Sequence, residues 1–238
     1  MSRPTAVIRT VVTLIGLTLF AQSAAHAADP AGIKIALAGD STVSNFAPQR
    51  PERGWGVFLG DYFDREVTID NFAKPGRSTK TFLEEGRWAK VLASHPDYIL
   101  IQFGHNDSHS PEHHEHTDPD GLYTELLTRF VNEARAAGAT PVLVTPVQRR
   151  TKRDTLLPYV AAMKKVAAQT HTPLVDLHEL SGELYARLGT SAQAILGATK
   201  TDTTHFNPAA ARRIAGLVAP ALVEVVPALK SHLVTPAK

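Results

Sequence analysis

The sequence predicts an α/β fold in which a parallel β-sheet has helices on both of its faces. Short apolar runs typical of buried strands alternate with longer segments of helical spacing along most of the chain. Strands that alternate with helices of this length form parallel sheets, because each crossover helix packs back onto the sheet. Polar motifs also begin where three of the apolar runs end, at the edge where such sheets bind ligands.

The individual elements follow from the apolar pattern and its interruptions. In chain order we expect a strand (33–38), a short helix (54–63), a strand (67–72), a helix (79–92), a strand (98–103), a helix (122–137), a strand (141–144), a helix (156–169), a last strand (174–177) and a final helix (208–226). Gly138 should stop the helix before it, since glycine is common just past a helix C-terminus. Pro208 suits the first turn of the final helix, whereas Pro220 should kink or split it.

Residues 1–27 have the pattern of a cleavable signal peptide. Arg3 and Arg9 form a basic start, residues 11–21 are apolar, and Ala25-His26-Ala27 is a small-x-small cleavage site. The apolar run is too short for a comfortable membrane span of about 20 residues. We therefore expect cleavage after Ala27 and a secreted or periplasmic protein. The alternative is an uncleaved anchor or an apolar helix of the fold.

The remaining residues, 28–238, are predicted to form a single domain. Removing residues 1–27 takes away two arginines and no acidic residue, so Lys+Arg falls from 25 to 23 and equals the 23 acidic residues. A formally neutral protein gives no reason to expect nucleic acid or a membrane surface as a partner. The chain has no cysteine, so packing of the core alone must stabilise it.

The first polar motif, Gly39-Asp40-Ser41-Thr42, ends the first predicted strand. A sharp turn there would leave one hydroxyl at the carboxyl edge of the sheet, so Ser41 is a candidate nucleophile. Asp-Ser-Thr is also a common helix N-cap cluster, and the assignment therefore depends on partners elsewhere. Three later motifs can supply them: Asn71-Phe72-Ala73-Lys74-Pro75-Gly76-Arg77-Ser78, Gly104-His105-Asn106-Asp107 and Asp202-Thr203-Thr204-His205-Phe206-Asn207.

These four motifs, in this order, resemble those of the SGNH hydrolases, also called GDSL-type esterases. The Gly-Asp-Ser-Thr start, the Gly-His-Asn-Asp third motif and the Asp-x-x-His-Phe ending are most similar to the rhamnogalacturonan acetylesterase branch. Each motif alone is a weak signal, whereas the ordered set is specific and spans nearly all of residues 28–238. The resemblance implies the SGNH hydrolase fold, a flavodoxin-like three-layer α/β/α arrangement with a five-stranded parallel sheet.

The residue types also suit acyl transfer. A serine hydroxyl is a weak nucleophile until a base takes its proton, and histidine is the usual base. We assign His205 as the base for Ser41 and Asp202 as the acceptor that orients its ring, which are the roles that the family gives to its Asp-x-x-His motif. Without the other motifs, Asp202 and His205 would instead be interpreted as a capping acid and an incidental surface histidine.

The resemblance implies three oxyanion-hole donors: the backbone N–H of Ser41, the backbone N–H of Gly76 and the side-chain amide of Asn106. Alone, Gly76 could mark a plain Pro-Gly turn, and Asn106 could cap a loop. We expect Asp40 and Asp107 to brace their turns through backbone N–H groups. His105 is expected to pack or to form hydrogen bonds within its loop.

Residues 109–118 contain four histidines and several acidic residues, which are potential metal ligands. A solvated loop is the preferred interpretation, because Pro111, Pro119 and Gly121 interrupt regular structure that would orient the rings. This loop could border the substrate cleft, since it follows Asn106. The serine mechanism requires neither a metal nor another cofactor, and we expect none.

Arg149 and Arg150, followed by Lys152 and Arg153, come after the strand at 141–144 and could bind a carboxylate such as that of galacturonate. A charged surface loop is the equally supported alternative. The chain departs from the family here: few residues separate this basic motif from the next helix, and the loop after Asp107 is short. The walls of the pocket should therefore differ, which puts the substrate in doubt more than the reaction.

Together these features predict a secreted carbohydrate O-acetylesterase that acts through a Ser-His-Asp acyl-enzyme, with acetylated pectic rhamnogalacturonan as the preferred substrate. Acetylated xylan or another plant glycan is the next choice. A secreted lipid esterase or lysophospholipase would use the same machinery but needs an apolar slot, and no long apolar loop lies near the motifs. A glycan- or flavin-binding module without activity is the last alternative. We expect a monomer.

Overall fold

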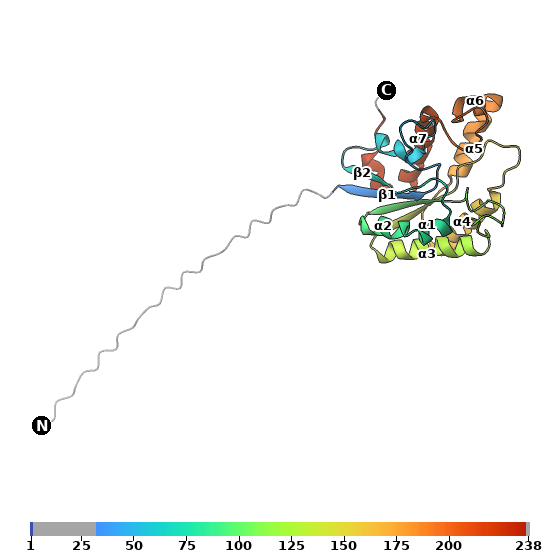
Figure 1. Cartoon of the computed structure of the whole chain (residues 1–238). Helices are drawn as coiled ribbons and strands as arrows, with labels where there is room; N and C mark the ends of the chain where they lie inside the picture. The colour runs from blue at the N-terminus through green and yellow to red at the C-terminus, as the bar shows by residue number, and fades with distance from the viewer. Residues whose placement is uncertain (2–31, 237–238) are drawn as a thin grey trace. The chain divides into compact units, whose positions relative to one another are not determined.

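The computed structural model of the chain describes Met1 and residues 32–236. The predicted signal peptide and its cleavage site therefore lie outside the described residues, apart from Met1. The part that begins at Gly32 is built on one five-stranded sheet with the order β2-β1-β3-β4-β5, in which every neighbouring pair is parallel (Figure 1). Its strands are β1 (Ile33–Gly39), β2 (Val67–Asn71), β3 (Tyr98–Gln102), β4 (Thr140–Val144) and β5 (Leu174–Val175).

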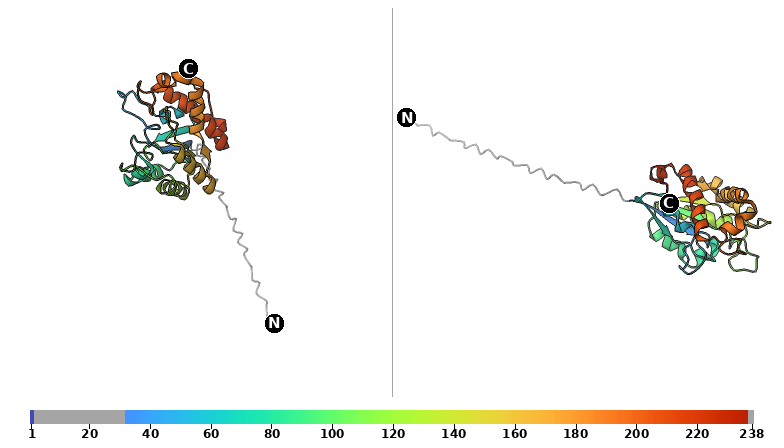
Figure 2. Two further views of the ribbon diagram at one scale, coloured as in Figure 1. Left: turned by 90° about the vertical axis from the view of Figure 1, so that its right-hand side faces the viewer. Right: turned by 90° about the horizontal axis from the view of Figure 1, so that it is seen from above.

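Helices cover both faces of this sheet, as the views in Figures 1 and 2 show. One face carries α1 (Thr79–Glu84), α2 (Arg87–Ala93), α3 (Leu122–Ala136) and α4 (Leu157–Thr170). The other carries the 3₁₀ helices η1 (Trp55–Val57), η2 (Leu59–Tyr62) and η4 (Pro227–His232) with α5 (Leu177–Leu188), α6 (Ala192–Leu196) and α7 (Pro208–Val225). A further 3₁₀ turn, η3 (Gly189–Ser191), joins α5 to α6. This arrangement confirms the predicted three-layer α/β/α fold.

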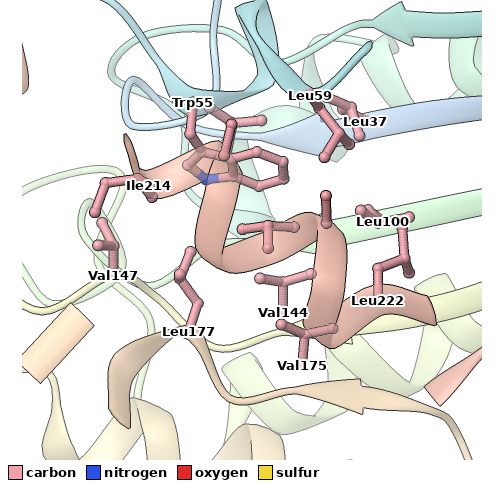
Figure 3. Packing of buried hydrophobic residues seen from close by; sticks show 14 of the residues in the cluster. Leu37, Trp55, Leu59, Leu100, Val144, Val147, Val175, Leu177, Ile214 and Leu222 are labelled. Atoms are coloured by element: carbon pink, nitrogen blue, oxygen red, sulfur yellow. The ribbon is translucent and has the colours of Figure 1, made fainter. Parts of the chain in front are cut away.

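Strand β1 shows how the apolar runs build two cores at once. Its side chains alternate, with Leu37 in the core beneath α7 and Ala36 and Ala38 in the core beneath α1–α4. Because both faces are covered, residues 35–38 need no polar position and form a continuous apolar run, whereas Lys34, nearer the start of the strand, is partly exposed. Figure 3 shows Leu37 with Leu100, Val144 and Val175 of the neighbouring strands, packed against residues such as Trp55 and Leu222.

The strand order places the candidate site. The chain leaves β1 for β2 on one side and then crosses to β3 on the other, so the order reverses between β1 and β3. Ligands of open parallel sheets bind beyond the carboxyl ends of the strands at such a switch point. The Gly39-Asp40-Ser41-Thr42 motif follows β1, and the Gly104-His105-Asn106-Asp107 motif follows β3.

Several predicted boundaries are wrong for local reasons. The expected helix at 54–63 is two 3₁₀ helices, and the expected helix at 79–92 is divided into α1 and α2. Gly86, with φ of +65°, separates these two helices because a left-handed residue cannot continue an α-helix. The last strand is also shorter than expected, since the Asp176 side chain accepts a hydrogen bond from the backbone of Glu179 and begins α5.

Helices α5 and α6 were not predicted, and α7 differs from its prediction in another way. Pro220 lies inside α7, yet α7 is one helix and is not split there. Proline has no backbone N–H, so the carbonyl of Gly216, four residues earlier, accepts no helical hydrogen bond from Pro220. Pro220 is exposed and Gly216 is partly exposed. Water can therefore bind that oxygen. Within the described residues, no helix is both long enough and apolar enough to cross a bilayer.

Candidate active site

Ser41, His205 and Asp202 form a chain of hydrogen-bond contacts at the carboxyl end of the sheet. The Oγ atom of Ser41 lies 2.9 Å from His205 Nε2, although 164 positions separate the two residues in sequence. On the other side of the ring, His205 Nδ1 lies 2.9 Å from Asp202 Oδ2. These are the nucleophile-to-base and base-to-acceptor contacts of a serine hydrolase triad.

The turn that carries Ser41 is stabilised by the side chain of Asp40 and by the close approach of Gly39 to β3. Asp40 Oδ1 accepts hydrogen bonds from the backbone N–H and the hydroxyl of Thr42, both at 2.8 Å, which confirms the expected bracing role of Asp40. A Cβ atom at Gly39 would lie 2.8 Å from a side-chain carbon of Val43 and 2.9 Å from the carbonyl oxygen of Gln102. Only glycine lets the turn pass this close to β3, so the exit from β1 depends on it.

The loop that carries His205 is shaped by Asp202 itself. Asp202 Oδ1 accepts hydrogen bonds from the backbone N–H groups of Thr204 (2.9 Å) and His205 (2.8 Å). Burial alone would raise the pKa of Asp202, but these backbone bonds and the His205 ring lower it below its usual value. Asp202 thus remains an acceptor while it orients the imidazole.

Arg150 anchors the same loop from outside. Its Nη2 donates to the carbonyl oxygens of Asp202 (2.9 Å) and His205 (2.7 Å), and its Nε donates to Gln193 Oε1 (3.0 Å). The guanidinium also lies 4.8 Å from the centre of the Phe206 ring. Sequence reasoning suggested substrate binding for Arg150, whereas its Nη2 is directed to the loop that carries Asp202 and His205, and its Nε to α6.

The second and third motifs meet beside Ser41. Gly76 has φ of +78°, a conformation that favours glycine, and Asn106 Nδ2 donates to the backbone carbonyl of the adjacent Arg77 at 3.0 Å. The backbone N–H of Lys74 donates to the carbonyl of Gly39, which ties the second motif to the end of β1. The structure therefore brings Ser41, Gly76 and Asn106, the three expected oxyanion-hole residues, to neighbouring segments of one rim.

Asp107 is fully buried and differs from its expected role. It accepts hydrogen bonds from the backbone N–H (3.1 Å) and hydroxyl (2.6 Å) of Thr79 and from the hydroxyl of Thr117 (2.8 Å). It therefore links the start of α1 to the loop before α3, rather than bracing its own turn. Burial raises the pKa of Asp107 to about 6, against the effect of these hydrogen bonds.

His105 lies against the carboxylate that precedes the nucleophile. Its Nδ1 is 3.3 Å from Asp40 Oδ2, and both side chains are buried. Burial lowers the pKa of His105, although the Asp40 carboxylate opposes this. Burial would raise the pKa of Asp40, but His105 and the bonds from Thr42 bring it below its usual value. Sequence reasoning assigned packing or loop hydrogen bonding to His105 and missed this pairing.

A buried polar chain behind Ser41 was also missed. The indole N–H of Trp55 donates to Gln102 Oε1 at 2.8 Å, and Gln102 Nε2 donates to the hydroxyl of Thr42. This chain joins η1, the end of β3 and the nucleophile turn. A glutamine at the end of an otherwise apolar strand was the available signal, since buried amides need partners on both sides.

Arg149 lies beside the same rim. Its Nη2 donates to the carbonyl of His105 at 2.9 Å, and its Nη1 donates to the hydroxyl of Thr155 at 2.8 Å. Together with Arg150 and Lys152 it lines a pocket of about 360 Å³ whose wall also includes Tyr185. Three basic residues thus share the wall of one pocket, although the hydrogen bonds of both arginines go to the protein, and carboxylate binding by these residues stays a prediction.

Among the described residues, one group of histidine and carboxylate side chains could hold a metal ion: His109, His113 and Glu115. None of these belongs to the Ser41–His205–Asp202 chain.

Comparisons with known proteins identify relatives with this set of motifs. Residues 37–213 match the family model of the GDSL-like lipase/acylhydrolases. The chain is 38% identical over 225 residues to the rhamnogalacturonan acetylesterase RhgT of Bacillus subtilis, a match that covers 85% of this chain and 95% of RhgT. It is 34% identical over 201 residues to the probable rhamnogalacturonan acetylesterase YesY of the same organism, covering 80% and 93% of the two chains.

A solved structure agrees with the fold. The crystal structure of Bacillus subtilis YxiM superimposes with a TM-score of 0.72 at 27% identity, covering 83% of this chain and 58% of YxiM.

Proposed function

Because the chain belongs to the GDSL-like lipase/acylhydrolase family, we propose that it is a carbohydrate O-acetylesterase with a Ser-His-Asp mechanism. Membership confirms the resemblance drawn from the four motifs, and the enzyme class is that of an esterase. The observation that carries the mechanism is the 2.9 Å contact between Ser41 Oγ and His205 Nε2, with Asp202 on the far side of the ring.

In the proposed first half-reaction, Ser41 Oγ attacks the acetyl carbonyl carbon while His205 Nε2 takes the hydroxyl proton. The negative charge that forms on the carbonyl oxygen is stabilised by the N–H groups of Ser41 and Gly76 and by the amide of Asn106. The tetrahedral intermediate then collapses: the bond from carbon to the sugar oxygen breaks, and His205 returns its proton to the departing alcohol.

In the second half-reaction, water attacks the acetyl-Ser41 ester and gives a proton to His205. Collapse of the second tetrahedral intermediate breaks the bond to Ser41 Oγ, releases acetate and restores the serine hydroxyl. Asp202 stays ionised throughout, accepts the hydrogen bond from His205 Nδ1 and stabilises the imidazolium. The lowered pKa of Asp202 suits this role.

Acetylated rhamnogalacturonan is the substrate that we propose. The similarity to RhgT and YesY over most of their lengths supports it. The positive charge of the pocket lined by Arg149, Arg150 and Lys152 supports an acidic glycan as well, since galacturonate residues carry carboxylates that it would attract. Acetylated xylan is the alternative within the same class, and it lacks those carboxylates unless it bears acidic branches.

The decisive experiment measures acetate release from acetylated pectic rhamnogalacturonan, acetylated xylan and a long-chain lipid ester. We expect release from the pectic substrate, less from xylan and little from the lipid ester. Ser41→Ala should lower kcat by about 10⁶-fold, as loss of the nucleophile does in other serine hydrolases. Acetate release by Ser41→Ala at the parental rate would refute the mechanism, and a preference for xylan would refute only the substrate.

We further propose that residues 28–238 are exported as a single-domain monomer after cleavage at Ala27. Expression of the full chain in a Gram-negative host, followed by N-terminal sequencing of the protein from the periplasm and the medium, tests this proposal. We expect a mature protein that starts at Ala28. An uncleaved chain that still starts at Met1 and stays in the cytoplasm would contradict export. Sedimentation of the purified protein determines its oligomeric state.

A further inference from the structure

The loop between Asn106 and α3 brings two histidines and a glutamate together at its surface. Glu115 Oε1 lies 2.6 Å from His109 Nδ1 and 3.8 Å from His113 Nδ1. One possible ligand atom from each of the three residues lies within 4.8 Å of the other two. Two imidazoles and one carboxylate are a donor set that zinc binds in proteins, with water in the fourth position.

Backbone turns hold the loop in this shape. The backbone N–H of His113 donates to the carbonyl of Ser110 at 2.9 Å, and the N–H of His116 donates to the carbonyl of His113 at 3.0 Å. Farther along, the N–H of Thr117 donates to the carbonyl of Asp107 at 3.2 Å and closes the loop. The solvated-loop interpretation depended on the absence of regular structure. Consecutive turns can orient the rings without a helix.

The histidines of this loop differ in the hydrogen-bond partners of their rings. His114 Nε2 lies 2.8 Å from a carboxylate oxygen of Glu84, and His116 Nδ1 lies 2.7 Å from the carbonyl oxygen of His109. The ring of His113 has no hydrogen-bond partner within the part of the chain that the structure describes, and it is about half exposed. His113 is therefore available as a ligand, whereas His114 has a different neighbour.

We propose that His109, His113 and Glu115 bind one divalent transition-metal ion, for which Zn²⁺ is the best match. Tetrahedral N and O ligands lie about 2.0–2.1 Å from zinc and so roughly 3.3 Å from one another. Glu115 Oε1 lies 2.6 and 3.8 Å from the Nδ1 atoms of His109 and His113, on either side of that separation. The ion takes the place of the contact between His109 Nδ1 and Glu115 Oε1 and cross-links the loop.

This site is separate from ester hydrolysis. The backbone N–H of His109 donates to the carbonyl of Asn106 at 3.1 Å, so the loop is continuous with the turn that carries a proposed oxyanion donor. A bound ion would stabilise that loop, while every step of acyl transfer still uses Ser41, His205 and Asp202. Metal binding is therefore testable without any measurement of activity.

Isothermal titration of Zn²⁺ into the untagged, EDTA-dialysed full chain at pH 7.5 tests the proposal. We expect one saturable site per chain. Loss of a residue that only supports a metal ligand costs about 10- to 100-fold in affinity, so His113→Ala and Glu115→Gln should each cost at least about 100-fold. His114→Ala, one residue along the same exposed loop, should bind as the parent does.

Cobalt supplies a second readout, because tetrahedral Co²⁺ absorbs visible light far more strongly than hydrated Co²⁺. The parent and His114→Ala should develop this spectrum, and His113→Ala should not. Equal unfolding temperatures in EDTA will show that His113→Ala is folded, which is expected because its exposed ring has no hydrogen bond to lose. Absence of one-to-one binding, binding that survives in His113→Ala, or equal loss in His114→Ala would each overturn the proposal.

Discussion

In the proposed mechanism the amide of Asn106 has two roles. Nδ2 has two hydrogens: one is used in the bond to the Arg77 carbonyl, and the other can bind the oxyanion. We expect Asn106→Ala to lower kcat for p-nitrophenyl acetate by about 10²- to 10³-fold, as loss of one oxyanion donor does elsewhere. Loss of the bond to Arg77 should cost only about 1 kcal/mol of stability.

Ser108→Ala is the matched control for Asn106→Ala. Ser108 lies two residues away, and its hydroxyl likewise donates to a backbone carbonyl, that of His105 at 2.9 Å. Its removal should lower the free energy of unfolding by a similar amount and leave kcat near the parental value. If both variants lost activity equally, Asn106 would have a structural role and not an electrostatic one.

The carboxyl of Asp107 makes the stability of the protein depend on pH. Its pKa in the folded state is about 6, above the ordinary value of 3.8. Between pH 3.8 and pH 6, therefore, Asp107 is largely protonated in the folded protein and largely ionised in the unfolded chain. The stabilisation is fully present below about pH 3.8 and is lost as the pH rises through 6, at no more than about 1.4 kcal/mol per pH unit.

Urea unfolding of the parent and Asp107→Asn at several pH values between 4 and 8 tests this dependence. The stability of the parent relative to Asp107→Asn should decrease from pH 4 through pH 6 and become constant above about pH 7. Asp202, whose lowered pKa acts in the opposite direction, is present in both proteins and cancels in the difference. A difference that stays constant over the whole range would contradict the raised pKa of Asp107.

Sequence reasoning found the residues of the candidate site but not the contacts that hold them. Ser41, Asp202 and His205 follow from motif order, because each motif ends a strand or precedes a helix at the same rim. The pairing of Asp40 with His105 could not be found this way, since it joins two motifs that were interpreted separately. The same holds for Asp107, whose partners Thr79 and Thr117 come from other segments.

The loop between α6 and α7, which carries Asp202 and His205, depends on Arg150 for its position. Arg150→Ala removes both bonds to the carbonyls of this loop, and small displacements of catalytic groups cost up to about 10²-fold in rate. We expect kcat for p-nitrophenyl acetate to fall by up to this factor with little change in KM. Arg150→Lys should recover part of the loss, because one amine cannot replace the planar guanidinium.

The choice of substrate separates this positioning role from the substrate-binding role that the sequence suggested. p-Nitrophenyl acetate has no carboxylate, so an arginine that only binds galacturonate would affect the pectic substrate and leave this ester unchanged. Arg153→Ala, an exposed residue of the same basic segment, is the matched control and should retain the parental kcat. Normal hydrolysis of p-nitrophenyl acetate by Arg150→Ala would exclude the positioning role.

Helices and strands were predictable where the apolar pattern was long and uninterrupted. Strands β1 and β3 and helices α3 and α4 match their predicted ranges to within one or two residues. Two of the failures occur where a single residue decides the boundary of a helix or strand. Gly86 divides α1 from α2 through its positive φ, and Asp176 turns the expected end of β5 into the start of α5. Propensity over a window cannot resolve such single-residue effects.

At the scale of the described domain, two apolar pockets and the candidate active site are formed by different residues. Two pockets with mostly apolar walls lie over α5, α7 and β5, and neither is lined by a residue of the four motifs. The pocket that includes Arg149 and Arg150 has a polar and basic wall. Because neither of these two apolar pockets is lined by Ser41 or His205, we predict that the protein prefers esters of short acyl groups.

We accordingly expect kcat/KM to fall from p-nitrophenyl acetate to the butyrate and again to the octanoate. Each of these two extensions of the acyl chain should cost about 1–3 kcal/mol of transition-state binding if the site does not accommodate it, which lowers kcat/KM roughly 10- to 200-fold. Ser41→Ala supplies the background rate for each ester, and measurements below the micellar concentration of the octanoate exclude interfacial effects. Equal or faster hydrolysis of the octanoate would mean that the rim opens an acyl slot on binding, as a lipid esterase requires, and would remove the physical basis for a glycan acetate as the substrate.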